Sequence, residues 1–470
     1  MSDRENDARD ADELSKLGYT QELLREMGGF SNFALSFSII SILTGGVVLY
    51  GHGLKYGGPF VMTVGWPLVT LMTLTVAASI AELASAYPTA GALYHWAALF
   101  GGPGWGFLTA WLNTIGQFAI TAAIDYGLAE FLAPSLGLPA DRAHVLPLCG
   151  AILLSHAVLN HVGVRVVAKM NTVSAWYHLI GVVALVLVVL VFAPKRNVSF
   201  LLERSTIARG GYAWGFALGL LQAQWTFTGY DASAHVTEET KDPRRNAPRG
   251  IMTSVIASGV AGYVMLLAVT SAIRDLPKTL QQDNQFIYVL TDALGKRGTA
   301  LVWMCMGAMW FCGLASVTSN SRMLFAFARD GGTPFSAKLS LVSKRFSSPH
   351  VAVWVSAAGA FVVAAWADAL SAMGALSTIA LYGSYGLPVL LALLARRAGR
   401  FHVRGPWHLG RWSNAINAIA IAWVAFVMVL FVLPPNLLAG YTFAGCLAVL
   451  AVYWFGYMKP RFAGPPLKLE

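Results

Sequence analysis

Two short stretches rich in glycine and hydroxyl side chains interrupt long apolar runs and could bind a small molecule that carries charge. They are residues 41–46 and residues 225–231. If each stretch breaks a helix inside a membrane, its backbone amides and carbonyls lose their helical partners and must find others. Amides at a helix N-terminus suit an anionic group, and free carbonyls suit a cationic group. The candidate ligand contacts in these stretches are Ser41, Thr44, Gly45, Gly46, Trp225, Thr226, Phe227, Thr228, Gly229 and Asp231.

The residue types in the two stretches suggest separate tasks. The amides at 44–46 would suit a carboxylate, although glycines here could equally serve helix packing. Trp225 and Phe227 would attract a desolvated ammonium by cation–π interaction, worth about 2 kcal/mol or more, or they would pack as ordinary apolar side chains. Asp231 would either cap the helical segment that follows it or contact the ligand directly.

Polar side chains elsewhere in the apolar runs are costly in a membrane and therefore informative. Asn113 and Gln117 lie one helical turn apart, and both would line the same cavity. Asp125 would face an outer vestibule and favour cationic ligands. His178 could carry a proton because histidine titrates near neutral pH, or it could form a neutral polar link between helices.

Charged and aromatic side chains at the ends of the apolar runs could form gates. Glu82 ends one run, and Glu238 and Glu239 follow another, close in sequence to the arginines at 244, 245 and 249. Opposite charges on one side of a membrane could close an inner gate, and solvated loop charges are the alternative. The inner gate candidates are Glu82, Tyr87, Glu238, Glu239 and Arg249, and the outer gate candidates are Tyr382 and Tyr385.

The composition indicates what kind of scaffold positions these residues. Of the 470 residues, 56% are hydrophobic and 12% are charged, about half the roughly 25% of charged residues in soluble domains. This composition argues against a soluble enzyme, a disordered chain and a secreted disulfide scaffold. Runs without Asp, Glu, Lys or Arg, each long enough to cross a bilayer, predict twelve membrane-spanning helices, which we number spans 1 to 12. The distribution of Lys and Arg predicts that both termini are cytoplasmic.

Spans 1 and 6 begin with similar patterns. Gly28-Gly29-Phe30 leads to Thr44-Gly45, and Gly210-Gly211-Tyr212 leads to Thr228-Gly229. Each pattern heads a block of five spans, and because five is odd, the second block must enter the membrane from the other side. We therefore predict an all-α integral membrane protein with a five-plus-five inverted repeat and discontinuous helices 1 and 6. The predicted segments are an N-terminal cytoplasmic tail (1–26), the first repeat (27–194), an extracellular loop (195–211), the second repeat (212–397), a loop with spans 11 and 12 (398–459), and a C-terminal cytoplasmic tail (460–470).

Residue spacing predicts neither a metal site nor a catalytic centre. His156 and His161 lie five residues apart, so they diverge by about 140° around a helix and do not share a face. The 4 cysteines show neither metal-ligand spacing nor a disulfide framework. The sequence also lacks a phosphate-binding GxxxxGK[ST] motif, so if the chain moves a solute across the membrane, an ion gradient or exchange would drive that movement. We expect no metal, no cofactor and no enzymatic activity.

Several motifs resemble the amino acid–polyamine–organocation transporter superfamily. They are residues 227–231 with the following Glu238-Glu239, residues 81–91, Trp176-Tyr177-His178, and residues 316–331. More narrowly, the chain is similar to the amino acid/choline transporter family, which includes GABA permeases and fungal choline permeases. The resemblance covers about residues 25–460. It implies two inverted repeats, unwound centres in helices 1 and 6, and alternating access.

The resemblance also bears on the coupling ion. In sodium-independent members of the superfamily, a lysine on span 5 often replaces the sodium ion of sodium-coupled relatives. No lysine lies within span 5 of this chain, and His178 falls close to that place. Hydroxyl side chains on span 8 could instead complete a sodium site. The coupling candidates are His178, Ser316, Thr318 and Ser319, with a proton favoured and sodium not excluded.

Together these features predict a secondary active transporter that moves an amino acid or related organic amine, GABA-like or an α-amino acid, by alternating access. Choline or a polyamine is the alternative substrate, and a membrane-embedded metal-dependent enzyme is the alternative class of protein. The expected partners are the small-molecule substrate and membrane lipid, with no nucleic acid and no obligatory protein partner. Short loops and compact tails favour a bacterial inner membrane.

Overall fold

The computed structural model describes residues 3–194, 198–367 and 370–466. The chain is built from helices, and the β-type pairing found in the described residues is one isolated bridge between Met27 and Thr240. The all-α prediction is therefore confirmed. Residues 195–197 of the predicted extracellular loop and residues 467–470 of the predicted C-terminal tail lie outside the described residues. The division of the chain into two repeats stays a prediction.

Ten helices in the described part of the chain are long and apolar enough to cross a membrane. Spans 6 and 9 are not among these ten helices and bring the number of spans to the predicted twelve. Span 6 is broken into short pieces, and span 9, α18 (His350–Trp366), has 17 residues. The unbroken long helices are α5 (Trp66–Ala86), α7 (Pro103–Ser135), α8 (Arg142–Val162), α9 (Val164–Phe192), α13 (Pro243–Ser271), α16 (Lys296–Arg329), α19 (Leu370–Arg397), α20 (Ser413–Val432) and α21 (Leu437–Tyr453). The shorter connecting helices are α1 (Asp3–Lys16), α6 (Leu93–Gly101), α14 (Leu276–Leu280), α15 (Gln285–Leu294) and α17 (Ser336–Leu339). Single turns of 3₁₀-helix cover Val198–Leu202, Thr237–Glu239 and Gly410–Trp412, and π-helical turns cover Val61–Gly65 and Trp454–Met458.

Span 1 is discontinuous, as predicted. Its first segment, α2 (Gly29–Ile40), ends at Ser41, whose φ of 30° lies in the left-handed region. The helix resumes as α3 (Gly45–Val48) and continues into α4 (Tyr50–Phe60). Within α4, Gly58 has a φ of 63° and turns the chain from span 1 into span 2, a conformation that only glycine adopts at little cost.

Span 6 is interrupted in the same manner. It consists of α10 (Tyr212–Gly219), α11 (Leu221–Thr226), a break over residues 227–231, and α12 (Ala232–His235). Gly229 inside the break has a φ of 90°. A Cβ atom at this position would lie 2.2 Å from Ile39 Cγ2, so both the backbone conformation and the close approach to span 1 require glycine.

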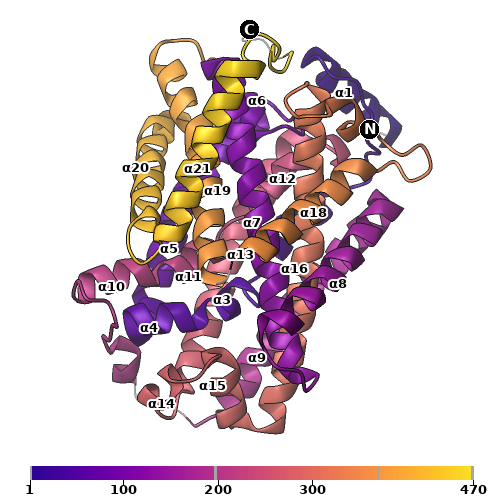
Figure 1. Cartoon of the computed structure of the whole chain (residues 1–470). Helices are drawn as coiled ribbons and strands as arrows, with labels where there is room; N and C mark the ends of the chain where they lie inside the picture. Colours follow the sequence, from indigo (N-terminus) through magenta and orange to yellow (C-terminus); the bar gives the residue numbers. More distant parts are fainter. Residues whose placement is uncertain (1–2, 195–197, 368–369, 467–470) are drawn as a thin grey trace.

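The long helices surround the two broken spans (Figure 1). α7 packs against α19 and α16, whereas α13 packs against α2 and α5. α20 and α21 lie together on one side of the bundle. The first described helix, α1, and the last described residues, which follow α21, lie at the same end of the molecule, which we call the terminal face, and α14 and α15 lie at the other end, which we call the opposite face (Figure 1).

The outer helices expose apolar side chains at helical spacing. On α9, the exposed side chains include Ile180, Val183, Leu187 and Val191. A helix surface of this kind would be unfavourable in water and is suited to lipid. Together with the long apolar helices, it identifies an integral membrane protein.

Candidate functional site

The two helix breaks lie against each other at the centre of the bundle. A Cβ atom added to Gly45 would lie 2.5 Å from Thr226 Oγ1 and 2.8 Å from Thr226 Cα. The neighbouring Gly46 faces a side chain instead, because its Cβ would approach Met265 Cε at 3.0 Å. Gly45 therefore allows spans 1 and 6 to approach each other at the breaks, which is the packing role that the sequence left open for the glycines of the first stretch.

Hydrogen bonds join the segment before the first break to the segment after the second. Ser36 Oγ donates to the Tyr230 carbonyl at 2.9 Å, and the Asn32 side-chain amide donates to the Ser233 carbonyl at 2.9 Å. The Ser233 amide in turn donates to Ser36 Oγ at 2.9 Å. α2 and α12 are thus held together as one unit. Sequence reasoning missed these residues, although Asn32 and Ser36 lie one helical turn apart in an apolar helix.

A small cavity of about 10 Å³ separates the two breaks, enough for about one water molecule. Its lining residues are Ile39, Ile40, Thr44, Gly45, Ile120, Ile124, Trp225, Thr226 and Cys312. Thr44, Gly45, Trp225 and Thr226 were predicted. Ile120 and Ile124 were missed, yet they follow Gln117 by three and seven residues and so share its helix face. At this volume the cavity is too small to hold an amino acid, and its lining residues are buried. We therefore call this conformation closed.

Several predicted contacts of the second stretch lie beside this cavity and not on its wall. The Phe227 ring packs against Trp66, with ring centroids 4.8 Å apart. Thr228 Oγ1 donates to the Trp225 carbonyl at 2.6 Å. Trp225, by contrast, does line the cavity; it is buried, and its Nε1 has no hydrogen-bond partner among the described residues.

Asp231 does not cap α12, which corrects one of the two interpretations of this residue. It occupies the cap position, but its side chain makes no capping hydrogen bond. The carboxylate instead accepts from the Tyr385 hydroxyl at 2.8 Å and from Asn113 Nδ2 at 3.1 Å, and it lies 3.1 Å from His235 Nε2. Tyr385 also accepts a hydrogen bond from the Gly229 amide at 3.1 Å. The carboxylate therefore links span 3 and span 10 to the break in span 6.

These contacts place Tyr385, a predicted outer-gate residue, at the break in span 6. Its hydroxyl is bound at the break and on the terminal side of it, since it contacts both Gly229 and Asp231. Tyr382 is also fully buried and lies 3.4 Å from Thr73 Oγ1 on α5. Both tyrosines are therefore packed inside the bundle in this conformation, and their role in an outer gate stays a prediction.

His178 lies at the first break, as its predicted position near the site requires. Its Nε2 lies 2.6 Å from Ser41 Oγ, and its Nδ1 lies 2.8 Å from the Ser174 carbonyl. Ser41 Oγ also lies 2.6 Å from Thr44 Oγ1. Because a hydroxyl can donate to Nε2, a neutral imidazole satisfies both contacts. This geometry favours the interpretation of His178 as a neutral link between helices.

The three hydroxyl side chains predicted on span 8 have separate partners. Ser316 Oγ lies 2.6 Å from Thr121 Oγ1, and Thr318 Oγ1 donates to Asn160 Oδ1 at 2.8 Å. Ser319 Oγ accepts from Gln117 Nε2 at 3.4 Å. They contact α7 and α8 and do not converge on a common point at the first break.

Asp125 does not face a vestibule, because its side chain is fully buried and lies 3.2 Å from His156 Nδ1. The two residues come from α7 and α8, which are adjacent. A buried carboxylate needs a partner, and the sequence gives no indication that a histidine 31 residues away would provide it.

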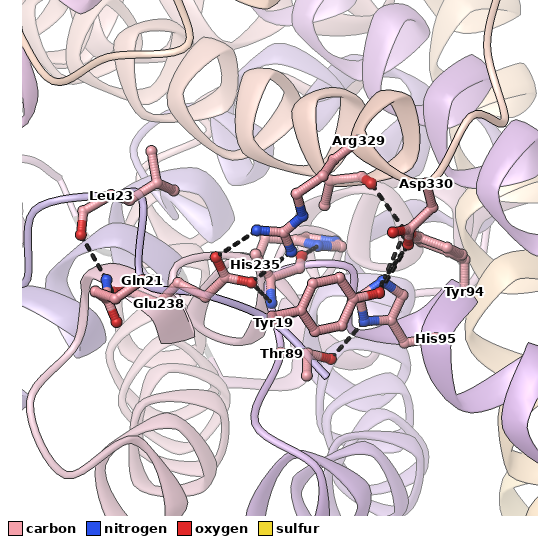
Figure 2. Close-up of polar contacts among 12 residues, drawn as sticks. Tyr19, Gln21, Leu23, Thr89, Tyr94, His95, His235, Glu238, Arg329 and Asp330 are labelled. Atoms are coloured by element: carbon pink, nitrogen blue, oxygen red, sulfur yellow. Dashed lines mark hydrogen bonds and ion pairs between the residues drawn. The ribbon is translucent and has the colours of Figure 1, made fainter. Parts of the chain in front are cut away.

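At the terminal face, the glutamates of the predicted inner gate pair with arginines of α16. Glu238 binds Arg329 through two contacts of 2.8 and 2.9 Å, and Glu239 binds the fully buried Arg322 at 3.1 Å (Figure 2 shows the former pair). The predicted partner Arg249 is exposed, so that part of the gate prediction is wrong. Arg322 and Arg329 follow the span 8 hydroxyls in sequence but were not predicted as gate residues.

Glu82 belongs to a different ionic group at the same face. It accepts hydrogen bonds from Arg396 at 2.7 Å, from the Ser413 hydroxyl at 2.8 Å and from the Leu409 amide at 3.1 Å. It therefore joins α5 to α19 and the start of α20. Tyr87 lies close by, where its ring packs at 6.1 Å from that of Phe100 and is buried.

The N-terminal tail contributes to the terminal face as well. The Tyr19 hydroxyl donates to Asp330 Oδ2 at 2.8 Å and lies 3.0 Å from His95 Nε2, and the Arg329 guanidinium lies 4.2 Å from the centre of its ring (Figure 2). Burial alone would raise the pKa of the Asp330 carboxyl, but hydrogen bonds from His95, Tyr94 and Tyr19 hold that pKa below its ordinary value. Burial lowers the pKa of His95. The folded structure therefore stabilises the ionised form of the Asp330 carboxyl.

The family model described as amino acid permease matches residues 27–457. The chain belongs to the amino acid permease family. It is 37% identical to the amino-acid permease BAT1 of Arabidopsis thaliana, with 96% of this chain and 95% of that protein covered. It is 38% identical to a BAT1 homolog of Oryza sativa subsp. japonica (90% and 87% covered) and 27% identical to the GABA-specific permease of Saccharomyces cerevisiae (97% and 86% covered).

Membership of the amino acid permease family means that the permease is a transporter and not an enzyme, and that its class of substrate is amino acids. The resemblance to the amino acid–polyamine–organocation superfamily is thereby confirmed. These relatives are plant and fungal proteins, so the prediction of a bacterial inner membrane gains no support from them.

Proposed function

We propose that the protein is a secondary active permease for a GABA-like or α-amino acid, driven by a proton gradient or by exchange. The observation that carries this proposal is the contact between the two helix breaks around a small closed cavity. A break in two helices at the same depth provides amides and carbonyls at one place. Those groups suit a molecule that carries both a carboxylate and an ammonium group.

The composition of the cavity wall supports an amino acid over choline. Among the described residues that line the cavity, one side chain is aromatic, that of Trp225. A quaternary ammonium is usually held by a cage of several aromatic rings. The wall is otherwise formed by isoleucines, small residues and hydroxyl groups. A short aliphatic substrate with polar ends would match this wall when the cavity expands.

In this proposal the terminal face is cytoplasmic and forms the inner gate. The pairs Glu238–Arg329 and Glu239–Arg322 tie the segment after α12 to α16. Because α12 is joined to α2, an inward opening would have to separate these ion pairs and expose the breaks. Alternating access would result if the inner gate at the terminal face opens only while the opposite face is closed, and the opposite face opens only while the inner gate is closed.

The test is transport by the purified full-length protein in proteoliposomes. Uptake of labelled alanine, GABA, choline and putrescine would be measured with an imposed pH gradient, with an imposed sodium gradient, and as exchange against internal substrate. We expect alanine or GABA to be transported and to be competed for by the unlabelled compound. Absence of transport and of competition for all four compounds would contradict the proposed function.

A further inference from the structure

Asp231 and His235 lie one helical turn apart, at and after the break in span 6, and both side chains are fully buried. His235 Nδ1 lies 3.1 Å from the Ala90 carbonyl oxygen, and His235 Nε2 lies 3.1 Å from Asp231 Oδ2. A carbonyl oxygen only accepts hydrogen bonds, so Nδ1 carries a hydrogen. The contact between Nε2 and Oδ2 then needs a second hydrogen, located on the imidazole or on the carboxyl group. The pair therefore holds one proton more than a neutral histidine beside a carboxylate.

The other groups that face Asp231 donate hydrogen bonds but supply no full positive charge. Tyr385 on α19 donates to Oδ1, and Asn113 on α7 donates to Oδ2. The Tyr230 ring packs against that of Tyr385, with centroids 5.0 Å apart. Neutral donors alone do not compensate a charge that is completely removed from water.

The ionic groups near the pair are already matched with one another. On the turn that follows α12, Glu238 is paired with Arg329 and Glu239 is paired with Arg322, both arginines coming from α16. Their charges cancel locally. Without the extra proton, the Asp231 carboxylate would be buried without a counter-charge and would face the lone pair of Nε2, and both effects are strongly unfavourable.

We propose that Asp231 and His235 together are the proton-binding site of this permease, an inference that rests on the proton-coupled function proposed above. In the closed conformation, the pair binds one proton between Nε2 and Oδ2. The proton leaves when the terminal face opens. No other bond is made or broken in this step.

Ala90 links opening of the terminal face to release of the proton. Its carbonyl accepts from His235, and its amide donates to Glu238 Oε1 at 3.2 Å. The loop between α5 and α6 is therefore docked on the inner part of span 6 through one residue (Figure 2 shows His235 beside Glu238). Separation of this loop from α12 would remove the acceptor from Nδ1 and admit water, which stabilises a free carboxylate and a neutral imidazole at neutral pH.

The pair is also connected to the helix break. The Tyr385 hydroxyl that donates to Asp231 accepts a hydrogen bond from the Gly229 amide. Gly229 lies in the middle of the break, and its contact with Ile39 reaches span 1. A change in the charge of Asp231 therefore acts directly on the residue that holds the break in position.

Two other buried histidines near the bundle centre satisfy their hydrogen bonds as neutral imidazoles. His178 contacts one backbone carbonyl and the hydroxyls of Ser41 and Ser174, which a neutral imidazole satisfies. His156 contacts Asp125 through Nδ1, and its Nε2 has no hydrogen-bond partner among the described residues, so a neutral imidazole with its hydrogen on Nδ1 satisfies that contact. Hydrogen-bond counting therefore distinguishes His235 from both.

The experiment separates coupling from exchange in proteoliposomes containing the full-length protein. Accumulation of labelled alanine and GABA driven by a pH gradient is measured beside exchange without a gradient. The variants are His235→Gln and the double variant D231N/H235Q, in which amides keep hydrogen-bonding groups but bind no proton. The matched control is D141N/H144Q, because Asp141 and His144 form an exposed aspartate–histidine pair 2.7 Å apart.

We expect the wild-type protein and D141N/H144Q to accumulate substrate in the pH gradient. His235→Gln should retain exchange, whereas its accumulation, like that of the double variant D231N/H235Q, should fall to the level measured without a gradient. Accumulation by D231N/H235Q at the wild-type ratio would overturn the inference. A loss of accumulation that is confined to the variant His156→Gln would overturn it too. A wild-type protein that exchanges substrate but ignores the pH gradient would overturn it as well. A wild-type protein that transports none of the compounds contradicts the proposed function instead.

A measurement without substrate keeps the inference testable if a variant transports poorly. The closed conformation binds a proton that the unfolded chain has released near neutral pH, so the folded state binds more protons and its stability must fall as the pH rises. The thermal midpoint of the wild-type protein should therefore fall more steeply between about pH 7 and pH 9 than that of His235→Gln or D231N/H235Q. Equal slopes would show that the pair holds no extra proton.

Discussion

The substitution Gly45→Ala is a direct test of the contact between the two breaks. The new Cβ would lie 2.5 Å from Thr226 Oγ1, 2.7 Å from Thr226 Cγ2 and 2.8 Å from Thr226 Cα. A rotamer change of Thr226 can relieve the first two contacts but not the third, which involves the backbone. To reach an ordinary contact of at least 3.4 Å from 2.8 Å, the two segments must move apart by about 0.6 Å.

Overpacking of this kind costs about 1–3 kcal/mol, equivalent to a change of about 5–150-fold in an equilibrium constant. The thermal midpoint of the purified protein should fall, and transport of alanine or GABA should weaken because Gly45 lines the cavity. The matched control is Gly46→Ala, whose Cβ would closely approach only the flexible end of Met265, at 3.0 Å, with Leu266 and Gln222 at ordinary contact distance. If Gly45→Ala is as stable and as active as Gly46→Ala, the close contact between spans 1 and 6 is not formed as described.

Three further predictions address the gate, the tail and the cavity. Glu239→Gln should lower the free energy of unfolding by about 3–5 kcal/mol, measured by denaturation, because it leaves the buried Arg322 without its counter-charge; a change below 1 kcal/mol would mean that the pair is solvated. The lowered pKa of Asp330 stabilises the fold above the ordinary aspartate pKa of about 3.9 and loses this effect as the pH falls through the lowered pKa. The wild-type thermal midpoint should therefore drop more than that of Asp330→Asn below about pH 4, and identical curves would contradict the assignment. Trp225→Ala should enlarge the cavity and raise the uptake of bulkier amino acids relative to alanine, so an unchanged selectivity ratio would place Trp225 outside the site.

The fold could be predicted from the sequence because a membrane span is a local property. About 20 apolar residues without charge define each span, and the glycines at 45 and 229 mark the two breaks. Span 9 shows the limit of this reasoning. Its charge-free run is long enough for a span, whereas the helix itself, α18, has only 17 residues.

The partners of charged side chains could not be predicted in the same way. Glu238 and Glu239 are close in sequence to Arg249, but their partners Arg322 and Arg329 come from the end of α16, which packs beside α12. Such a pairing depends on which helix ends are neighbours in space. The pair of Asp231 and His235 was accessible, since residues four apart on a helix face each other, and this signal was missed.

The shortness of α18 has a consequence for the membrane around the protein. A helix of 17 residues is about 25 Å long, whereas the hydrocarbon core of a typical bilayer is about 30 Å thick. The lipid next to this helix must therefore become thinner, or the flanking polar side chains must extend to reach the headgroups. Acyl chain length then acts on the permease through hydrophobic mismatch, at the side of the bundle where α18 packs against α7 and α8.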